Sequence, residues 1–116
     1  MMRSGKRKEN LDMKHIAMQI KMFVDVQRNY RNASLTSSYV VDALGISRTS
    51  LAKIMKITMN TTFTRYLLEC RLKHARRHVC LKGDSASAEH IAALTGFATL
   101  RTFKEKYKEK YGIQIH

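Results

Sequence analysis

A short apolar segment ended by a glycine occurs twice in this chain, with Gly45 and Gly96 51 positions apart. The two segments are 40–47 (VVDALGIS) and 91–98 (IAALTGFA), and in each an apolar residue follows the glycine directly. Glycine permits the positive φ of a tight reversal between two helices, which is the requirement of a helix-turn-helix. A single glycine turn fits any helical bundle, whereas two with the same layout predict a tandem pair of helix-turn-helix units.

Apolar spacing and capping residues predict the helices around the first glycine. Between positions 13 and 30, apolar residues recur every three or four positions, as on one buried face of a helix. Thr36 is expected to begin a second helix that Gly45 ends, and Ser47 is expected to begin a third. The third helix should bury Leu51, Ile54 and Met55.

The second half of the chain is predicted to contain the longest helix, a loop and two shorter helices. Asn60 is expected to end the third helix in the left-handed conformation. The long helix follows at about 63–81, then a loop at 83–87 and a last helix at 99–111 that Gly112 ends. The buried stripe of the long helix should contain Tyr66, Leu67, Cys70, Ala75, Val79 and Leu81. The predicted fold class is all-α, with about six to seven helices.

These helices predict four regions. They are a basic disordered tail at 1–12, a first unit at 13–62, a linker helix at 63–82 and a second unit at 83–116. The basic N-terminal segment is followed by polar residues and not by an apolar segment, so no export signal is expected. The sequence also has no run of about 18 apolar residues, which a membrane-spanning helix would need. With two cysteines, a disulfide framework is not expected either. The predicted location is cytoplasmic, with the nucleoid.

The charge favours a nucleic acid partner. The chain carries 22 Lys+Arg against 9 Asp+Glu, a formal net charge of +13, so double-stranded DNA is the first partner to consider. Aromatic residues make up 8% of the chain and are needed for the core, so no stacking platform for single strands is expected. We expect no enzyme and no cofactor, because the sequence shows neither a carboxylate pair, a nucleophile with a base, nor a glycine-rich phosphate loop.

The predicted linker helix carries residues of the types that bind zinc. Cys70, His74 and His78 follow one another at four-residue steps, with Cys80 nearby, and cysteine and histidine are zinc ligands. The alternative is structural: Cys70 lies in the apolar stripe, and the two histidines fit an exposed basic face. Because no Cys-x-x-Cys pair is present, we expect no metal.

The chain resembles the C-terminal DNA-binding domain of the AraC/XylS family of bacterial transcription regulators over about residues 13–112. In the first unit the resemblance rests on Leu44-Gly45-Ile46-Ser47 and Leu51. In the second unit it rests on Ile91-Ala92, Gly96-Phe97, Phe103, Tyr107-Lys108 and Tyr111-Gly112. Since only a dozen residues precede the first predicted helix, we expect either a short stand-alone member or a fragment of a larger regulator.

The resemblance implies that helices at about 47–57 and 99–111 enter successive major-groove segments. One protomer would then read two segments about 10 bp apart, so a monomer on DNA is expected. Arg and Lys can address guanine, and Thr or Leu a thymine methyl. The candidates for base contact are Arg48, Thr49, Lys53, Leu100, Arg101 and Lys104. The candidates for backbone contact are Ser47, Lys56, Arg65, Arg71, Arg76, Arg77, Thr99, Lys106 and Lys108.

The expected function is sequence-specific DNA binding and transcription regulation, with RNA polymerase as a further partner. The alternative is a DNA-bending accessory factor for recombination or excision of a mobile element. Residues 34–80 carry eight basic and two acidic side chains, whereas 81–116 carry six and four. The first unit is therefore expected to supply more of the binding energy, with Lys53 more important for affinity than Arg101.

Overall fold

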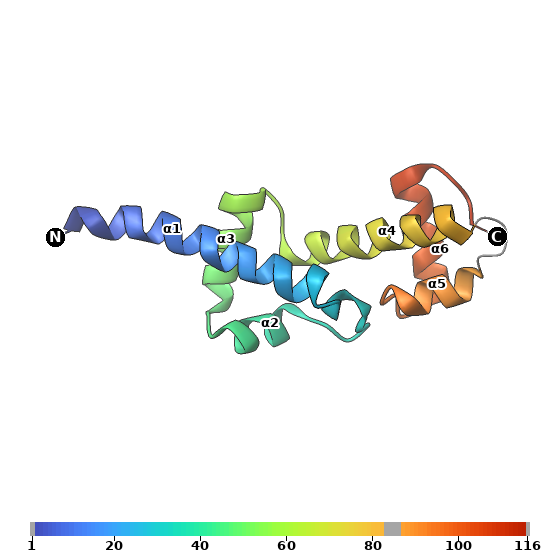
Figure 1. Cartoon of the computed structure of the whole chain (residues 1–116), viewed down its shortest axis with the longest axis horizontal. Coiled ribbons are helices and arrows are strands. Elements are labelled where there is room, and N and C mark those ends of the chain that lie inside the picture. The colour runs from blue at the N-terminus through green and yellow to red at the C-terminus, as the bar shows by residue number, and fades with distance from the viewer. Residues whose placement is uncertain (1, 83–86, 116) are drawn as a thin grey trace.

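The protein is helical throughout the part of the chain that the structure, a computed structural model, describes: residues 2–82 and 87–115. In chain order the elements are α1 (Met2–Lys21), a π-helical turn η1 (Met22–Val26), a 3-10 turn η2 (Asn29–Arg31), α2 (Ser37–Leu44), α3 (Arg48–Met59), α4 (Phe63–Lys82), α5 (Ala88–Leu94) and α6 (Leu100–Tyr111) (Figure 1). The predicted all-α fold is confirmed. Most of the predicted loop, at 83–86, lies outside the described residues.

Capping residues stabilise the helix ends, and all of those at α2 and α3 were predicted, whereas Thr99 was predicted to be the first residue of the last helix and is instead its N-cap. At the starts of α2, α3 and α6, a side-chain oxygen accepts a hydrogen bond from the backbone N–H three residues later, and the three caps are Thr36, Ser47 and Thr99. The same helices end in the left-handed conformation at Gly45 (φ 68°), Asn60 (φ 52°) and Gly112 (φ 69°). Ser87 caps α5 in the same way as the other three caps. These local signals were readable because each depends on one or two neighbouring residues.

The first helix differs from its prediction at both ends. It begins at Met2, within the segment predicted to be a disordered tail, and it stops at Lys21 instead of continuing to position 30. At its C-terminal end the N–H of Gln27 bonds to the carbonyl of Met22 at 2.8 Å, five residues back, and Arg28 takes the left-handed conformation at φ 62°. Buried apolar residues lie on both sides of this point, Val24 before it and Tyr30 after it. Their spacing in the sequence is therefore that of one continuous helix.

Two separate hydrophobic cores lie along the linker helix. The first contains Leu51, Ile54 and Met55 of α3, as predicted, together with residues of α1, η1, η2 and α2. The second is formed by residues of α4, α5 and α6 with Phe97 of the connecting turn, and its largest members are Phe103 and Tyr107. The molecule is accordingly elongated, with extents of 61 × 24 × 20 Å (Figure 1).

The linker helix α4 contacts the two cores with different faces. Leu67 and Cys70 belong to the first core, whereas Leu72 and Ala75 belong to the second. A single buried stripe was therefore the wrong description, and Leu81, predicted to be buried, is 78% exposed. With 3.6 residues per turn, Leu81 lies on the face of Leu67 and Cys70 but about three turns beyond Cys70, past the first core.

Among the helices of the described residues, none is both long and apolar enough to cross a membrane.

Candidate nucleic-acid interface

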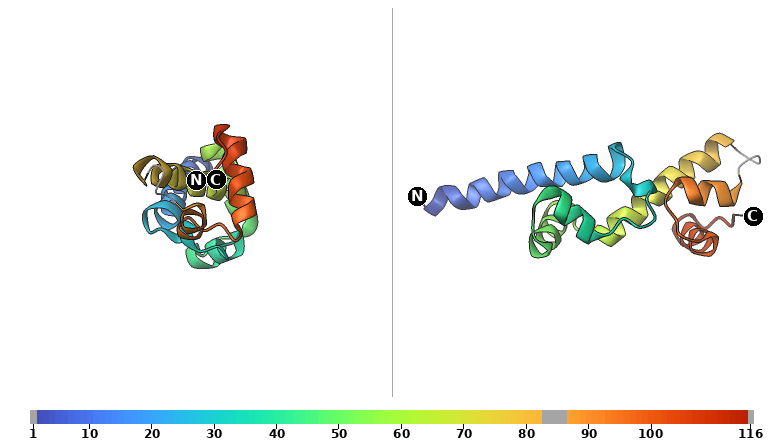
Figure 2. Two further views of the ribbon diagram at one scale, coloured as in Figure 1. Left: turned by 90° about the vertical axis from the view of Figure 1, so that its right-hand side faces the viewer. Right: turned by 90° about the horizontal axis from the view of Figure 1, so that it is seen from below.

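The two predicted recognition helices, α3 and α6, lie on one side of the molecule. Both run across its long axis (Figure 1). In the view from below, both are seen nearly end-on at the edge opposite α1 (Figure 2). Each is preceded by the shorter helix of its unit across a turn of three to five residues. The fold therefore presents two helices, from far-separated parts of the sequence, to the same side.

The exposed face of α3 carries the predicted base-contact residues of the first unit. Because Leu51, Ile54 and Met55 are buried, the opposite face is left to solvent. The exposed side chains on α3 and its N-cap include Ser47, Arg48, Thr49, Lys53 and Lys56. The guanidinium of Arg48 donates to Ser38 Oγ of α2. This bond spans the glycine turn and holds Arg48 at the start of α3.

The exposed face of α6 carries the corresponding residues of the second unit. Arg101 is 88% exposed and its Nε lies 3.1 Å from Glu105 Oε1. The pair lies in water and is weak, so Glu105 can be displaced by a stronger acceptor. Thr99 and Lys108 are exposed, and Lys104 and Lys106 are half-exposed. Leu100, predicted to be exposed toward the groove, is instead half-buried against the second core.

Two arginines of α4 have different surroundings from those predicted. Arg71 is half-buried; its Nε donates to the Tyr30 carbonyl at 2.9 Å and its Nη2 to the Asn32 carbonyl at 2.8 Å. Arg76 donates from Nη1 to the Tyr107 hydroxyl at 3.1 Å and lies 5.3 Å from the ring centroid of Tyr111. Both donate to groups of the protein itself, so fewer of their donors are available to a phosphate than in a fully exposed arginine. Arg65 and Arg77 of the same helix are exposed, as expected.

A polar cluster that was not predicted from the sequence joins η1 to α4. Asp25 Oδ2 lies 2.7 Å from Lys73 Nζ, and Asp25 Oδ1 lies 2.6 Å from His74 Nε2. The ring of His74 also stacks on Tyr30 at 4.2 Å, so its predicted place on an exposed basic face was wrong. Burial by itself raises the pKa of Asp25, but the hydrogen bonds from Lys73 and His74 bring that pKa below its ordinary value. The one sign of this cluster in the sequence is Asp25 itself, an acidic residue within an apolar segment.

The cysteines differ from each other in environment. Cys70 is buried and Cys80 is exposed. Burial raises the pKa of Cys70, although its hydrogen bond with Tyr66 lowers it in part. Among the described residues, no three His, Cys, Asp or Glu side chains are grouped as metal ligands would be. Cys70 thus lies in the first core as a small apolar residue.

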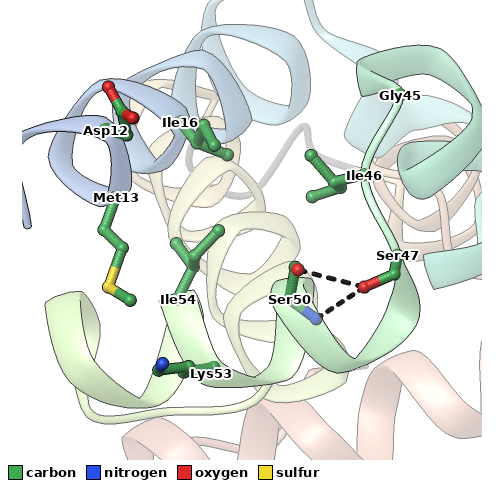
Figure 3. Close-up of a pocket in the computed structure, with 9 residues that line it drawn as sticks. All are labelled: Asp12, Met13, Ile16, Gly45, Ile46, Ser47, Ser50, Lys53 and Ile54. Carbon is green, nitrogen blue, oxygen red and sulfur yellow. Dashed lines mark hydrogen bonds between the residues drawn. The ribbon is translucent and has the colours of Figure 1, made fainter. Parts of the chain in front are cut away.

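A pocket of about 500 Å³ separates α1 from the N-terminal half of α3 (Figure 3). Ile16 lines it from α1, and Ile46 and Ile54 line it from the helix-turn-helix. Ser47 Oγ accepts from the Ser50 backbone N–H at 3.0 Å on the same wall, and Lys53 also lines the pocket. Two predicted DNA contacts, Ser47 and Lys53, therefore border this pocket while their side chains remain exposed.

Comparison with known proteins fits this geometry. Residues 40–115, most of the chain, match the family described as a helix-turn-helix domain. The chain belongs to the AraC/XylS family of DNA-binding domains. The match covers both glycine turns, α3, α4 and α6. This family is defined by DNA binding and is not a class of enzymes.

Individual members of the AraC/XylS family and solved structures agree with this assignment. The transcriptional activator RhrA of Rhizobium meliloti is 30% identical over 89 residues, which are 77% of this chain and 28% of that relative. The chain thus spans less than a third of that relative's length. The C-terminal domain of the response regulator yesN from Fusobacterium nucleatum has a TM-score of 0.75 at 24% identity, covering 86% of this chain and 99% of that one. The C-terminal domain of AraT from Geobacillus stearothermophilus has a TM-score of 0.76 at 21% identity, covering 85% and 78%. These two structures support the fold.

Proposed function

We propose that this chain binds a specific site in double-stranded DNA and regulates transcription there, with α3 and α6 in successive major-groove segments of one DNA face. The observation that carries the proposal is the presence of two capped helices with exposed cationic residues on the same side of the molecule. The linker helix has 20 residues and is therefore about 30 Å long. This length is close to the helical repeat of DNA, about 34 Å, so one protomer suffices for both segments.

The proposed DNA contacts are assigned to residues whose side chains are exposed or half-exposed. Base contacts are assigned to exposed or half-exposed polar residues near the start of each recognition helix: Arg48, Thr49, Lys53, Arg101 and Lys104. Phosphate contacts are assigned to Ser47, Lys56, Arg65, Arg77, Thr99, Lys106 and Lys108. Leu100, Arg71 and Arg76 are left out because each is only partly exposed and packs against or bonds to another part of the protein, whereas Arg48 and Arg101 remain exposed. Neutralising several phosphates makes the affinity steeply dependent on salt.

Regulation is favoured over the DNA-bending role by the relative that is named a transcriptional activator. RNA polymerase is the proposed second partner, through the side of the molecule away from α3 and α6. Footprinting across a genome tests this part of the proposal. Sites upstream of transcription start points support regulation, whereas sites confined to recombination ends would assign the chain to the accessory role.

Selection of bound sequences from random DNA tests the binding mode. We expect a site with two conserved blocks about 10 bp apart, centre to centre. Lys53→Ala should relax sequence preference in the block bound by α3, and Arg101→Ala in the other block, with about five- to 150-fold losses for matched sites. Lys14→Ala, which removes an exposed charge from α1, is the matched control and should keep both preferences. One conserved block, or none at physiological salt, would contradict the proposal.

A further inference from the structure

Three parts of the molecule meet at the main-chain carbonyl of Tyr30. This carbonyl belongs to η2 of the first unit, and it accepts the hydrogen bond from Arg71 of the linker helix at 2.9 Å. Gly96, in the glycine turn of the second unit, packs against the same carbonyl: a Cβ at position 96 would lie 2.0 Å from the Tyr30 oxygen and 2.8 Å from Arg71 Nε. The turn between α5 and α6 consequently lies beside η2 (Figure 1).

The arginine is well suited to hold this junction. Its planar guanidinium offers several donors in a fixed arrangement, and two of them are used at once, on the carbonyls of Tyr30 and Asn32. Both acceptors lie about 40 residues away in the sequence, at separations of 41 and 39. Tyr30 is itself fixed, because it is buried and its ring stacks on His74 of α4. Arg71 is thus held by a rigid partner on the first unit.

The junction matters because the two hydrophobic cores have no buried residue in common among the described residues. Each core packs on its own stretch and face of α4. Apart from the path of α4, the position of α6 relative to α3 therefore depends on contacts such as this junction. Long helices are rarely straight, so the path of α4 does not by itself determine this position.

We infer that Arg71 is a positioning residue for DNA recognition: its bonds to Tyr30 and Asn32, with Gly96 packed on the same carbonyl, fix α6 relative to α3 and so set the spacing of the two half-sites that the chain accepts. This inference rests on the proposed function. Arg71 itself does not contact DNA; it acts through the recognition helices. Removing it should leave each half-site's contacts intact and weaken the discrimination between spacings.

The test measures affinity for selected DNA sites in which the spacer between the two blocks is lengthened or shortened one base pair at a time. For the native chain we expect the best spacing to be favoured by about tenfold or more over its neighbours, the cost of losing one good contact. Arg71→Met keeps the length of the side chain and loses both hydrogen bonds. In this variant the preference should fall to about threefold or less, with affinity for a single block within about twofold of native.

Two further variants complete the design. Arg31→Met removes an exposed charge next to the junction and should keep the native spacing profile. Arg71→Lys keeps the charge but has one compact donor group, so it should give an intermediate profile. Thermal unfolding establishes that each variant is folded, and if Arg71→Met does not fold, Arg71→Lys carries the test.

The outcomes separate the inference from the proposed function. A folded Arg71 variant with the native spacing profile would overturn the inference. Failure of the native chain to select any two-block site would instead overturn the proposed function. A flattened profile for the Arg71 variants, with Arg31→Met unchanged, supports both.

Discussion

Replacing Gly96 by alanine tests the junction through stability, independently of DNA. Gly96 has a φ of 86°, and placing a Cβ-bearing residue in the left-handed region costs about 1–2 kcal/mol. The new Cβ would lie 2.0 Å from the Tyr30 oxygen, so the carbonyl must move. Movement disrupts the bond from Arg71, and a hydrogen bond to a charged group contributes about 1.5–3 kcal/mol. The total loss expected for Gly96→Ala is about 3–5 kcal/mol of the free energy of unfolding.

Gly45→Ala is the matched control for backbone strain. Gly45 has a similar φ of 68°, but a Cβ there meets nothing within 4 Å. This variant should therefore lose only the strain energy, about 1–2 kcal/mol. Chemical denaturation of both variants, followed by circular dichroism, gives the two free energies of unfolding. The difference between them should be about 1.5–3 kcal/mol, and equal losses for the two variants would contradict the proposed contact between Gly96 and the Tyr30 carbonyl.

Three other predictions concern single side chains. Cys80 is exposed and Cys70 is buried with a raised pKa, so a thiol reagent at neutral pH should modify Cys80 in the folded protein and Cys70 only after denaturation; rapid modification of both would contradict this. The lowered pKa of Asp25 contributes stability that is complete above the ordinary aspartate pKa of about 3.9 and is lost as the pH falls through the lower folded value. Asp25→Asn should therefore lose stability near neutral pH and flatten this acid limb in urea titrations, and an unchanged limb would contradict the assignment. Lys53→Ala should reduce DNA affinity more than Arg101→Ala at the same salt concentration, and the reverse order in a binding titration would show that the second unit dominates.

Local features of this fold were predictable from the sequence. The predicted caps Thr36 and Ser47 each act on a backbone N–H three residues away, and the buried face of α3 follows directly from its apolar spacing. The exposed residues of both recognition helices were predictable for the same reason, because they lie opposite the buried faces; Leu100, which is half-buried, is the exception. The candidate site was readable to this extent because it lies on short, regular helices.

The side-chain partners that the sequence did not predict come from contacts between distant residues. Arg71 and Arg76 look like the exposed cations Arg65 and Arg77 in the sequence, but their acceptors lie 41 and 31 residues away. His74 pairs with Asp25, 49 residues away. Such pairings follow from the way the units pack, which a periodic pattern does not contain.

The predicted single stripe on α4 failed for a related reason. A helix shared by two cores is buried on two faces, with Leu67 and Cys70 on one and Leu72 and Ala75 on the other. A pattern read for one face then misplaces residues near the end, such as Leu81. The predicted length of the first helix failed for a different reason: the helix continues as η1 and ends before the left-handed Arg28, but the apolar spacing continues beyond that point.

The central claim is that one protomer reads two successive major-groove segments with α3 and α6. Hydroxyl-radical footprinting of a selected site, combined with the mass of the protein–DNA complex in solution, tests it most directly. The account predicts one protomer per site and two protected segments about 10 bp apart on one face of the duplex. A single protected segment per protomer, or two protomers on the same site, would contradict it.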